Sequence, residues 1–148
     1  MTAYVQGRVY YVQENYTAAG TAFQEALGPA DTYTLLRRCY IGLGDVYRDC
    51  AALARLGTSP IQNPASKSAG PLSAGITQNA LRYDTTLWEM LAMAYFEAYH
   101  TDASVPGDYL SRAADCFNRV IEPGRMKDYL YSNLYTIYYL PAAWDFDR

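Results

Sequence analysis

His100 is the single histidine of the chain and is therefore its first candidate for acid–base or metal chemistry. A catalytic histidine works beside a nucleophile or a carboxylate in a pocket from which water is excluded. Residues 100–107 (HTDASVPG) have the composition of an exposed loop, and the sequence around them nominates no partner group. The pattern favours a surface position for this side chain.

The other reactive residue types form no catalytic or metal-binding pattern. The three cysteines, Cys39, Cys50 and Cys116, are widely spaced, which indicates small buried apolar residues in a reducing compartment. Asp145 and Asp147 could act as an acid–base pair or bind a cation, but their place near a chain end favours solvation. No glycine-rich phosphate-binding motif occurs. We therefore expect no enzyme activity, no cofactor and no metal.

The charge and hydropathy of the chain exclude two further classes. Its 148 residues carry a net charge of −3, whereas a nucleic-acid-binding domain has a basic surplus gathered on one face. No apolar run approaches the ~20 residues that cross a bilayer, so we expect no direct membrane insertion. A soluble domain is expected, with the cytoplasm favoured, and it could belong to a membrane-anchored parent protein.

Helical spacing of apolar residues dominates the chain, and strand-like alternation is not sustained anywhere. Two stretches rich in proline, glycine and small polar residues, 57–71 and 100–107, are expected to be loops. The expected helices cover residues 3–13, 16–27, 31–56, 72–83, 85–99, 108–121 and 126–140.

One stripe of four residues recurs along these helices. It places an aromatic residue, a leucine, a small residue and a tyrosine at offsets 0, 3, 4 and 7, which share one helical face. A weaker version contains Gly7 and Tyr10. The full stripes are Tyr40-x2-Leu43-Gly44-x2-Tyr47, Trp88-x2-Leu91-Ala92-x2-Tyr95 and Tyr131-x2-Leu134-Tyr135-x2-Tyr138, the last with Tyr135 at the small position. We expect the stripe tyrosines to lie in the core.

A second pattern marks the helices that follow. Ala19-x3-Phe23-x2-Ala26 and Ala113-x3-Phe117-x2-Val120 have the same spacing. Together the two patterns resemble the tetratricopeptide repeat family, whose consensus is W-x2-L-G-x2-Y…A-x3-F…P. The resemblance covers nearly the whole chain and implies an all-α, right-handed solenoid of helical hairpins with about three and a half repeats. An irregular helical bundle that carries the pattern in two places is the alternative.

The resemblance divides the chain into one domain of successive repeats. The last stretch, residues 144–148, is similar to the opening of another second helix, so we expect a longer parent protein. The expected repeats cover residues 3–28, then 31–83 with the loop 57–71, then 85–123 with the loop 100–107, and a partial repeat over 126–148.

In tetratricopeptide-like solenoids the first helix of each hairpin lines a concave groove that holds the ligand. Carried onto this sequence, the groove positions are Tyr4, Arg8, Tyr11, Arg38, Asp45, Arg48, Glu89, Met93, Phe96, Tyr129, Ser132 and Tyr139. Tyrosine and arginine are the residues that protein interfaces favour. The arginines could attract an acidic or phosphorylated segment.

These features lead to two functional hypotheses. The first is an interaction scaffold or adaptor that binds a protein or peptide partner in the groove. The second is a structural spacer that self-associates through the open end of the solenoid, where apolar surface is exposed. The tyrosine density is also similar to that of helical-repeat regions in bacterial multidomain signalling proteins.

Overall fold

A computed structural model describes residues 2–102 and 105–121, and within them every regular element is a helix, as predicted. The elements in chain order are α1 (Thr2–Val12), α2 (Tyr16–Leu27), α3 (Tyr33–Arg55), α4 (Pro64–Ile76), the short 3-10 helix η1 (Asn79–Tyr83), α5 (Thr85–Thr101) and α6 (Tyr109–Ile121). The predicted partial repeat and its groove residues Tyr129, Ser132 and Tyr139 lie outside the described residues.

The first three helices have nearly the predicted bounds because local signals define their ends. Glu14 adopts a positive φ of 60° and turns the chain after α1. The side chain of Asn15 accepts a hydrogen bond from the amide of Ala18 and caps α2. Thr32 caps α3 in the same way through the amide of Leu35. Gly57, with a φ of 74°, ends α3 in the left-handed region that glycine adopts readily.

The predicted loop 57–71 is wrong from residue 64 onward, because α4 begins at Pro64. A proline at the first helical position has no amide to leave unpaired. The amide of Ser66 in the first turn donates to Oδ2 of Asp102, 2.7 Å away at the end of α5. Pro71 lies inside α4, where proline costs ~3 kcal/mol or more. Contacts with the rest of the molecule therefore supply what the local sequence lacks.

The predicted helix at 72–83 divides accordingly into the end of α4 and the short helix η1. The predicted loop 100–107 is also too long, since α5 continues to Thr101. Asp84 caps α5 by accepting hydrogen bonds from the amides of Thr86 and Leu87 at 3.0 and 3.3 Å. The two connecting segments predicted at 57–71 and 100–107 are therefore shorter in the structure than in the prediction.

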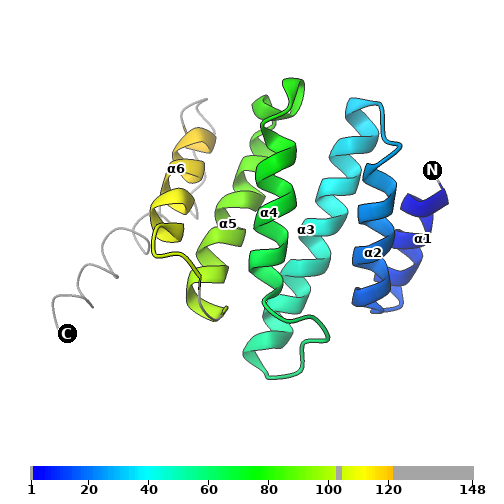
Figure 1. The fold of residues 1–148 in the computed structure, drawn as a ribbon, viewed down its shortest axis with the longest axis horizontal. Coiled ribbons are helices and arrows are strands. Elements are labelled where there is room, and N and C mark those ends of the chain that lie inside the picture. Colours follow the sequence, from blue (N-terminus) through cyan, green and yellow to red (C-terminus); the bar gives the residue numbers. More distant parts are fainter. Residues whose placement is uncertain (1, 103–104, 122–148) are drawn as a thin grey trace, which may run out of the picture.

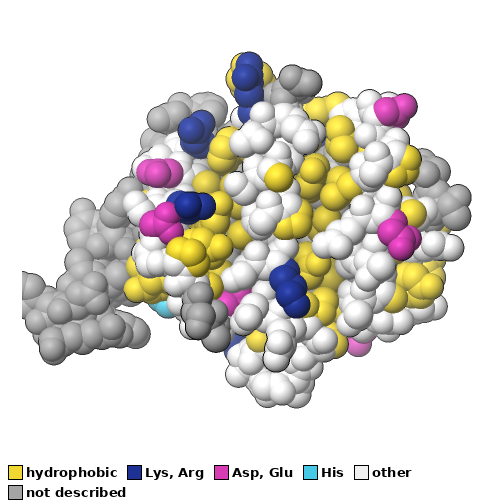
Figure 2. Space-filling view, in the orientation of Figure 1, with side chains coloured by type: hydrophobic (Ala, Val, Ile, Leu, Met, Phe, Trp, Pro, Cys, Tyr) yellow, Lys and Arg dark blue, Asp and Glu magenta, His cyan; other side chains and the backbone are white. Residues whose placement is uncertain are grey.

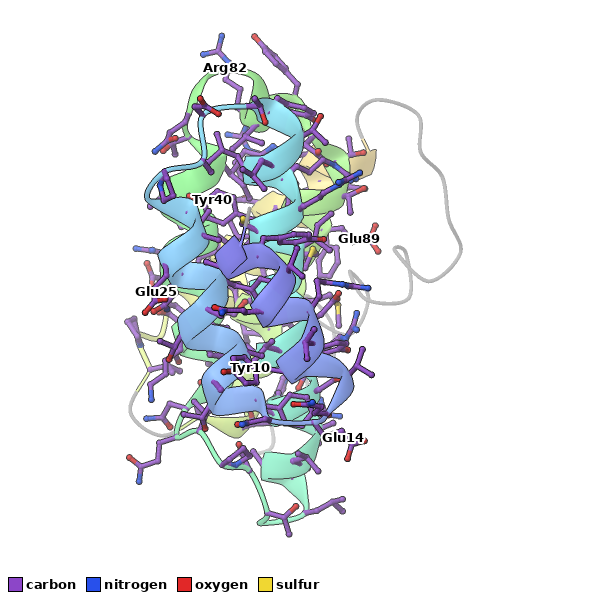
Figure 3. All side chains as sticks on the ribbon, turned by 90° about the vertical axis from the view of Figure 1, so that its right-hand side faces the viewer. Tyr10, Glu14, Glu25, Tyr40, Arg82 and Glu89 are labelled. Atoms are coloured by element: carbon purple, nitrogen blue, oxygen red, sulfur yellow. The ribbon has the colours of Figure 1, made fainter. Side chains whose placement is uncertain are left out.

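The helices form two layers (Figure 1). Each helix packs against the next in the chain, and α3 also contacts α1 and α5. Figure 3, turned by 90°, shows α2 on one side and α1 on the other, with Glu25 of α2 and Glu89 of α5 on opposite sides. The helices α1, α3 and α5 therefore share one face, and α2, α4 and α6 share the other.

The buried side chains include those of the predicted stripes. Tyr40, Tyr47 and Tyr95 are buried, and Tyr10 is half-buried. The residues of the second pattern in α2 and α6 are also buried, including Phe23 and Phe117. The stripe prediction is confirmed for Tyr40, Tyr47 and Tyr95, whereas Tyr10 of the weaker stripe is only partly in the core.

Phe23 lies where three helices meet. A Cβ atom added to Gly7 of α1 or to Gly42 of α3 would stand 2.7 Å from this ring. The ring of Tyr4 also packs on Phe23, with 5.8 Å between centroids. Both glycines are therefore needed for α1 and α3 to approach α2 closely.

The three cysteines are buried, as predicted, and each is a free thiol. Burial raises the pKa of the Cys39 and Cys50 thiols, and it raises that of Cys116 to about 12. All three are therefore protonated packing residues at neutral pH.

Candidate binding site

A cavity of about 250 Å³ lies among α3, α4 and α5. Its lining comes from α3 (Gly44, Tyr47, Arg48 and Ala51), from α4 (Ala65 and Ser68) and from α5 (Glu89, Met90, Met93, Ala94 and Glu97). Ala65 and Ser68 are buried, whereas the side chain of Arg48 is 66% exposed. The cavity therefore has its floor on α4 and its mouth on the face shared by α1, α3 and α5, where Glu89 lies (Figure 3).

Small residues on all three helices leave space for the cavity: Gly44 and Ala51 on α3, Ala65 and Ser68 on α4, and Ala94 on α5. Within α4, Ser68-x3-Leu72-x2-Gly75 has the spacing of Ala19-x3-Phe23-x2-Ala26, with a leucine in place of the phenylalanine. On the α3 side, Gly44 leaves room that the methyl group of Met90 enters, 1.9 Å from where a Cβ would stand. A flexible methionine thus lies against Gly44, whereas an aromatic ring, that of Phe23, lies against Gly7, the small residue of the weaker stripe.

The α3 rim of the cavity carries a network of charged and hydroxyl groups. A guanidinium nitrogen of Arg48 lies 3.2 Å from Asp45 and another lies 3.7 Å from Asp49. The hydroxyl of Tyr11 on α1 donates to Asp49 at 2.7 Å. Burial, followed by this hydrogen bond, raises the pKa of Tyr11 to about 12. The network joins α1 to α3 and compensates the charge of Arg48.

On the α3 rim, the side chain of Asp45 is less exposed than that of Asp49. Burial raises the pKa of its carboxyl; Arg48 opposes that rise, and the neighbouring Asp49 adds to it. Arg8 of α1 also acts to lower the pKa of Asp45, so its positive charge reaches the same rim. The predicted groove positions on α1 and α3 are therefore electrostatically coupled.

The α5 rim is acidic. Glu89 and Glu97 both line the cavity, and Arg55 from the end of α3 forms an ion pair with Glu97. Around the mouth, four carboxylates (Asp45, Asp49, Glu89 and Glu97) face two guanidinium groups (Arg48 and Arg55), or three when Arg8 is included. This balance disfavours the acidic or phosphorylated ligand that the arginines alone suggested.

The opposite face of the molecule differs. Figure 2 shows the face formed by α2, α4 and α6, where a few charged side chains are scattered among apolar and uncharged atoms. Lys67 is the charged residue of α4, and it is exposed.

The structure divides the predicted groove residues into three groups. Arg48, Glu89 and Met93 meet at the cavity, and Asp45 and Tyr11 join its rim through the network just described. Tyr4 and Phe96 are half-buried and pack on the hydrophobic clusters, with the ring of Phe96 also 4.6 Å from that of His100. Arg8 and Arg38 are exposed.

Sequence reasoning missed most of the cavity lining. Glu97 could have been found, because Glu89, Met93 and Glu97 follow one another at four-residue steps on one helical face. Ala65 and Ser68 could not, because their segment was interpreted as a loop.

Among residues 2–102 and 105–121, no group of three His, Cys, Asp or Glu side chains is placed to hold a metal ion. His100 is exposed, and its ring packs edge-on against Phe96 and Tyr99. In the same part of the chain no helix is long and apolar enough to span a bilayer.

Comparison of the chain with protein-family models, with curated proteins and with solved structures finds no match.

Proposed function

We propose that this chain is a tetratricopeptide-type solenoid of helical hairpins that acts as an interaction scaffold. Its partner, a peptide segment or a protein domain, binds on the face formed by α1, α3 and α5. The recurring stripes and the row of successively packed helices support the solenoid.

The cavity among α3, α4 and α5 carries the binding proposal. Binding sites are concave and mostly apolar, with a few polar groups that fix orientation. This cavity has that character, since methionine and alanine side chains line it and Arg48, Glu89 and Glu97 stand at its mouth. Three predicted groove residues, Arg48, Glu89 and Met93, come together there from two helices that are separate in sequence.

The proposal can be tested by affinity capture from a lysate of the source cells. The wild-type chain is compared with the double variant Arg8→Glu and Arg48→Glu, which reverses two charges on the proposed binding face. We expect at least one protein that the wild type retains and the double variant loses, because rim charges set the orientation and rate of association.

The matched control is the double variant Lys67→Glu and Arg82→Glu. It changes the net charge equally, and both of its residues are exposed away from the cavity lining. Circular dichroism must show that both variants remain folded. A partner that both variants lose, or that both retain, would contradict binding at the α1, α3 and α5 face.

A structural spacer that self-associates is the second candidate. Val5, Val9 and Val12 lie on one face of α1 and are 51%, 49% and 76% exposed. An apolar stripe of this kind at the end of a helical row could stack against another unit. Sedimentation at increasing concentration tests this candidate: it predicts dimers that Val5→Lys with Val9→Lys disrupts, and a strict monomer would exclude it.

A further inference from the structure

We infer that the cavity among α3, α4 and α5 receives an aromatic side chain from a peptide that carries a basic residue beside it. This inference rests on the proposed function and specifies its ligand. Three observations carry it: the size of the cavity, the chemistry of its lining and the charge of its α5 rim.

The size suits a ring. An apolar protein cavity of about 150 Å³ holds benzene. The present cavity, at about 250 Å³, admits a phenylalanine side chain with space left for its Cβ and for rearrangement of the methionines. A phenylalanine ring already lies against a stripe glycine elsewhere in the molecule, since a Cβ added to Gly7 would stand 2.7 Å from the ring of Phe23.

The lining suits an aromatic group more than a polar one. Met90 and Met93 form the α5 wall, and Tyr47 contributes from α3. Methionine sulfur makes favourable contacts with aromatic rings, and its flexible chain adapts to an entering group. Since the Met90 methyl group is the far end of a flexible chain, it can move aside from Gly44 when a ligand enters.

The charged residues at the mouth of the cavity favour one sign of charge on the ligand residue beside the aromatic anchor. Among its cavity-lining residues, α5 contributes Glu89 and Glu97 and no cation. On the α3 side, Asp45 and Asp49 compensate Arg48. Arg55 pairs with Glu97, so the four carboxylates around the mouth face three guanidinium groups, those of Arg8, Arg48 and Arg55. This small excess of negative charge favours a lysine or arginine next to the aromatic anchor over a carboxylate or phosphate.

The test uses the full chain with 13C-labelled methionine methyl groups, observed by NMR. The probe is an eight-residue glycine–serine peptide with one phenylalanine between two lysines. Met90 and Met93 report on the cavity, and substitution of each by leucine assigns their signals. We expect the probe to shift both signals in a saturable way.

Two matched peptides measure separately what the phenylalanine ring and the lysine charges contribute to binding. Replacing the phenylalanine of the probe by alanine should weaken binding roughly ten- to hundredfold, because burial of the ring is lost. Replacing both lysines by glutamate should weaken it at least tenfold. The inference is wrong if the alanine peptide binds as well as the probe, if the glutamate peptide binds as well, or if neither methyl signal moves.

Two variants of the chain check the location. Ser68→Leu fills the cavity from its floor and should abolish the methyl shifts while the melting temperature is retained. If this variant fails to fold, Gly44→Ala serves instead, because its Cβ displaces the Met90 methyl group into the cavity. Undiminished probe binding by a folded filled variant would overturn the assignment.

Failure of the aromatic-anchor inference can be distinguished from failure of the proposed scaffold function. A partner captured by the wild type and lost by the Arg8 and Arg48 variant would uphold the scaffold, even if the phenylalanine probe left both methyl signals unchanged. In that case the aromatic anchor is wrong and the binding face stands. Absence of both the partner and the methyl shifts would reject both.

Discussion

The carboxylate of Asp84 accepts a hydrogen bond from Nε of Arg37 at 2.6 Å, and this contact fastens the start of α5 to the start of α3. The hydroxyl of Tyr33 donates to the same carboxylate at 2.7 Å, and the amides of Thr86 and Leu87 complete its partners. Asp84 is buried, so every partner replaces water that the carboxylate has lost. One residue thus caps α5 and positions two neighbouring helices of the face formed by α1, α3 and α5.

Replacing Asp84 by alanine should destabilise the chain by about 2–4 kcal/mol, through loss of the cap and of hydrogen bonds to a charged group. Urea unfolding measures this change. Asp115→Ala, at an exposed position of α6, is the control and should stay within ~0.5 kcal/mol of the wild type. Equal effects of the two substitutions would show that the Asp84 contacts add nothing to stability.

The same carboxylate should make stability depend on acid pH. Burial alone would raise the pKa of Asp84, but the hydrogen bonds from Tyr33, Arg37 and the Leu87 amide outweigh it and lower the pKa. Its stabilisation is therefore complete above the unfolded pKa of about 3.9 and is lost as pH falls through the folded value. Melting temperatures measured from pH 6 to pH 2 should fall more for the wild type than for Asp84→Asn. Parallel curves would contradict this assignment.

Two glycines of α3 should respond differently to substitution by alanine. At Gly42 the new Cβ meets the rigid ring of Phe23, which should cost about 1–3 kcal/mol. At Gly44 it meets only the movable end of Met90, and the gain in helix propensity of up to about 1 kcal/mol offsets the displacement. Denaturant unfolding of both variants checks the difference, and an equal loss in both would contradict the packing described.

Asp102 should stabilise α4 although it belongs to the end of α5. Asp102→Ala removes the acceptor for the Ser66 amide, so hydrogen exchange in the first turn of α4 should accelerate roughly fivefold or more. Asp108→Ala is the matched control, because Asp108 pairs with Arg112 at an exposed site. Unchanged exchange in α4 after the Asp102 substitution would show that this cap is dispensable.

The buried cysteines should be unreactive in the folded chain. Thiolates are the reactive form, and burial raises the pKa of all three thiols. A thiol reagent at pH 8 should therefore label Cys39, Cys50 and Cys116 only as fast as the chain opens, and immediately in denaturant. Rapid labelling of any of them in the native chain would contradict its buried place.

Prediction from sequence succeeded where the local signals agree with the packing. The predicted ranges 3–13, 16–27 and 31–56 and the stripe around Leu43 agree with the structure, where Asn15 and Thr32 cap α2 and α3 locally. The all-α class follows from these signals, because helical periodicity requires no knowledge of distant contacts.

Prediction failed at α4, where composition and packing disagree. The segment from Pro64 to Pro71 contains prolines, serines and a glycine that indicate a loop, and the cap from Asp102 lies 36 residues away. No local rule reveals a distant cap of this kind. The cavity was missed for the same reason, since its floor is made by Ala65 and Ser68 of this helix.

The position of Phe23 limits how short an N-terminal fragment can be if it is to keep its native packing. Residues 1–30 contain both helices of the first hairpin, yet Gly42, which the Phe23 ring also contacts, belongs to α3. A fragment cut after α2 would leave part of that ring in water and lose the close fit that both glycines permit. A fragment from this end of the molecule therefore needs α3 as well as α1 and α2 to keep the packing around Phe23.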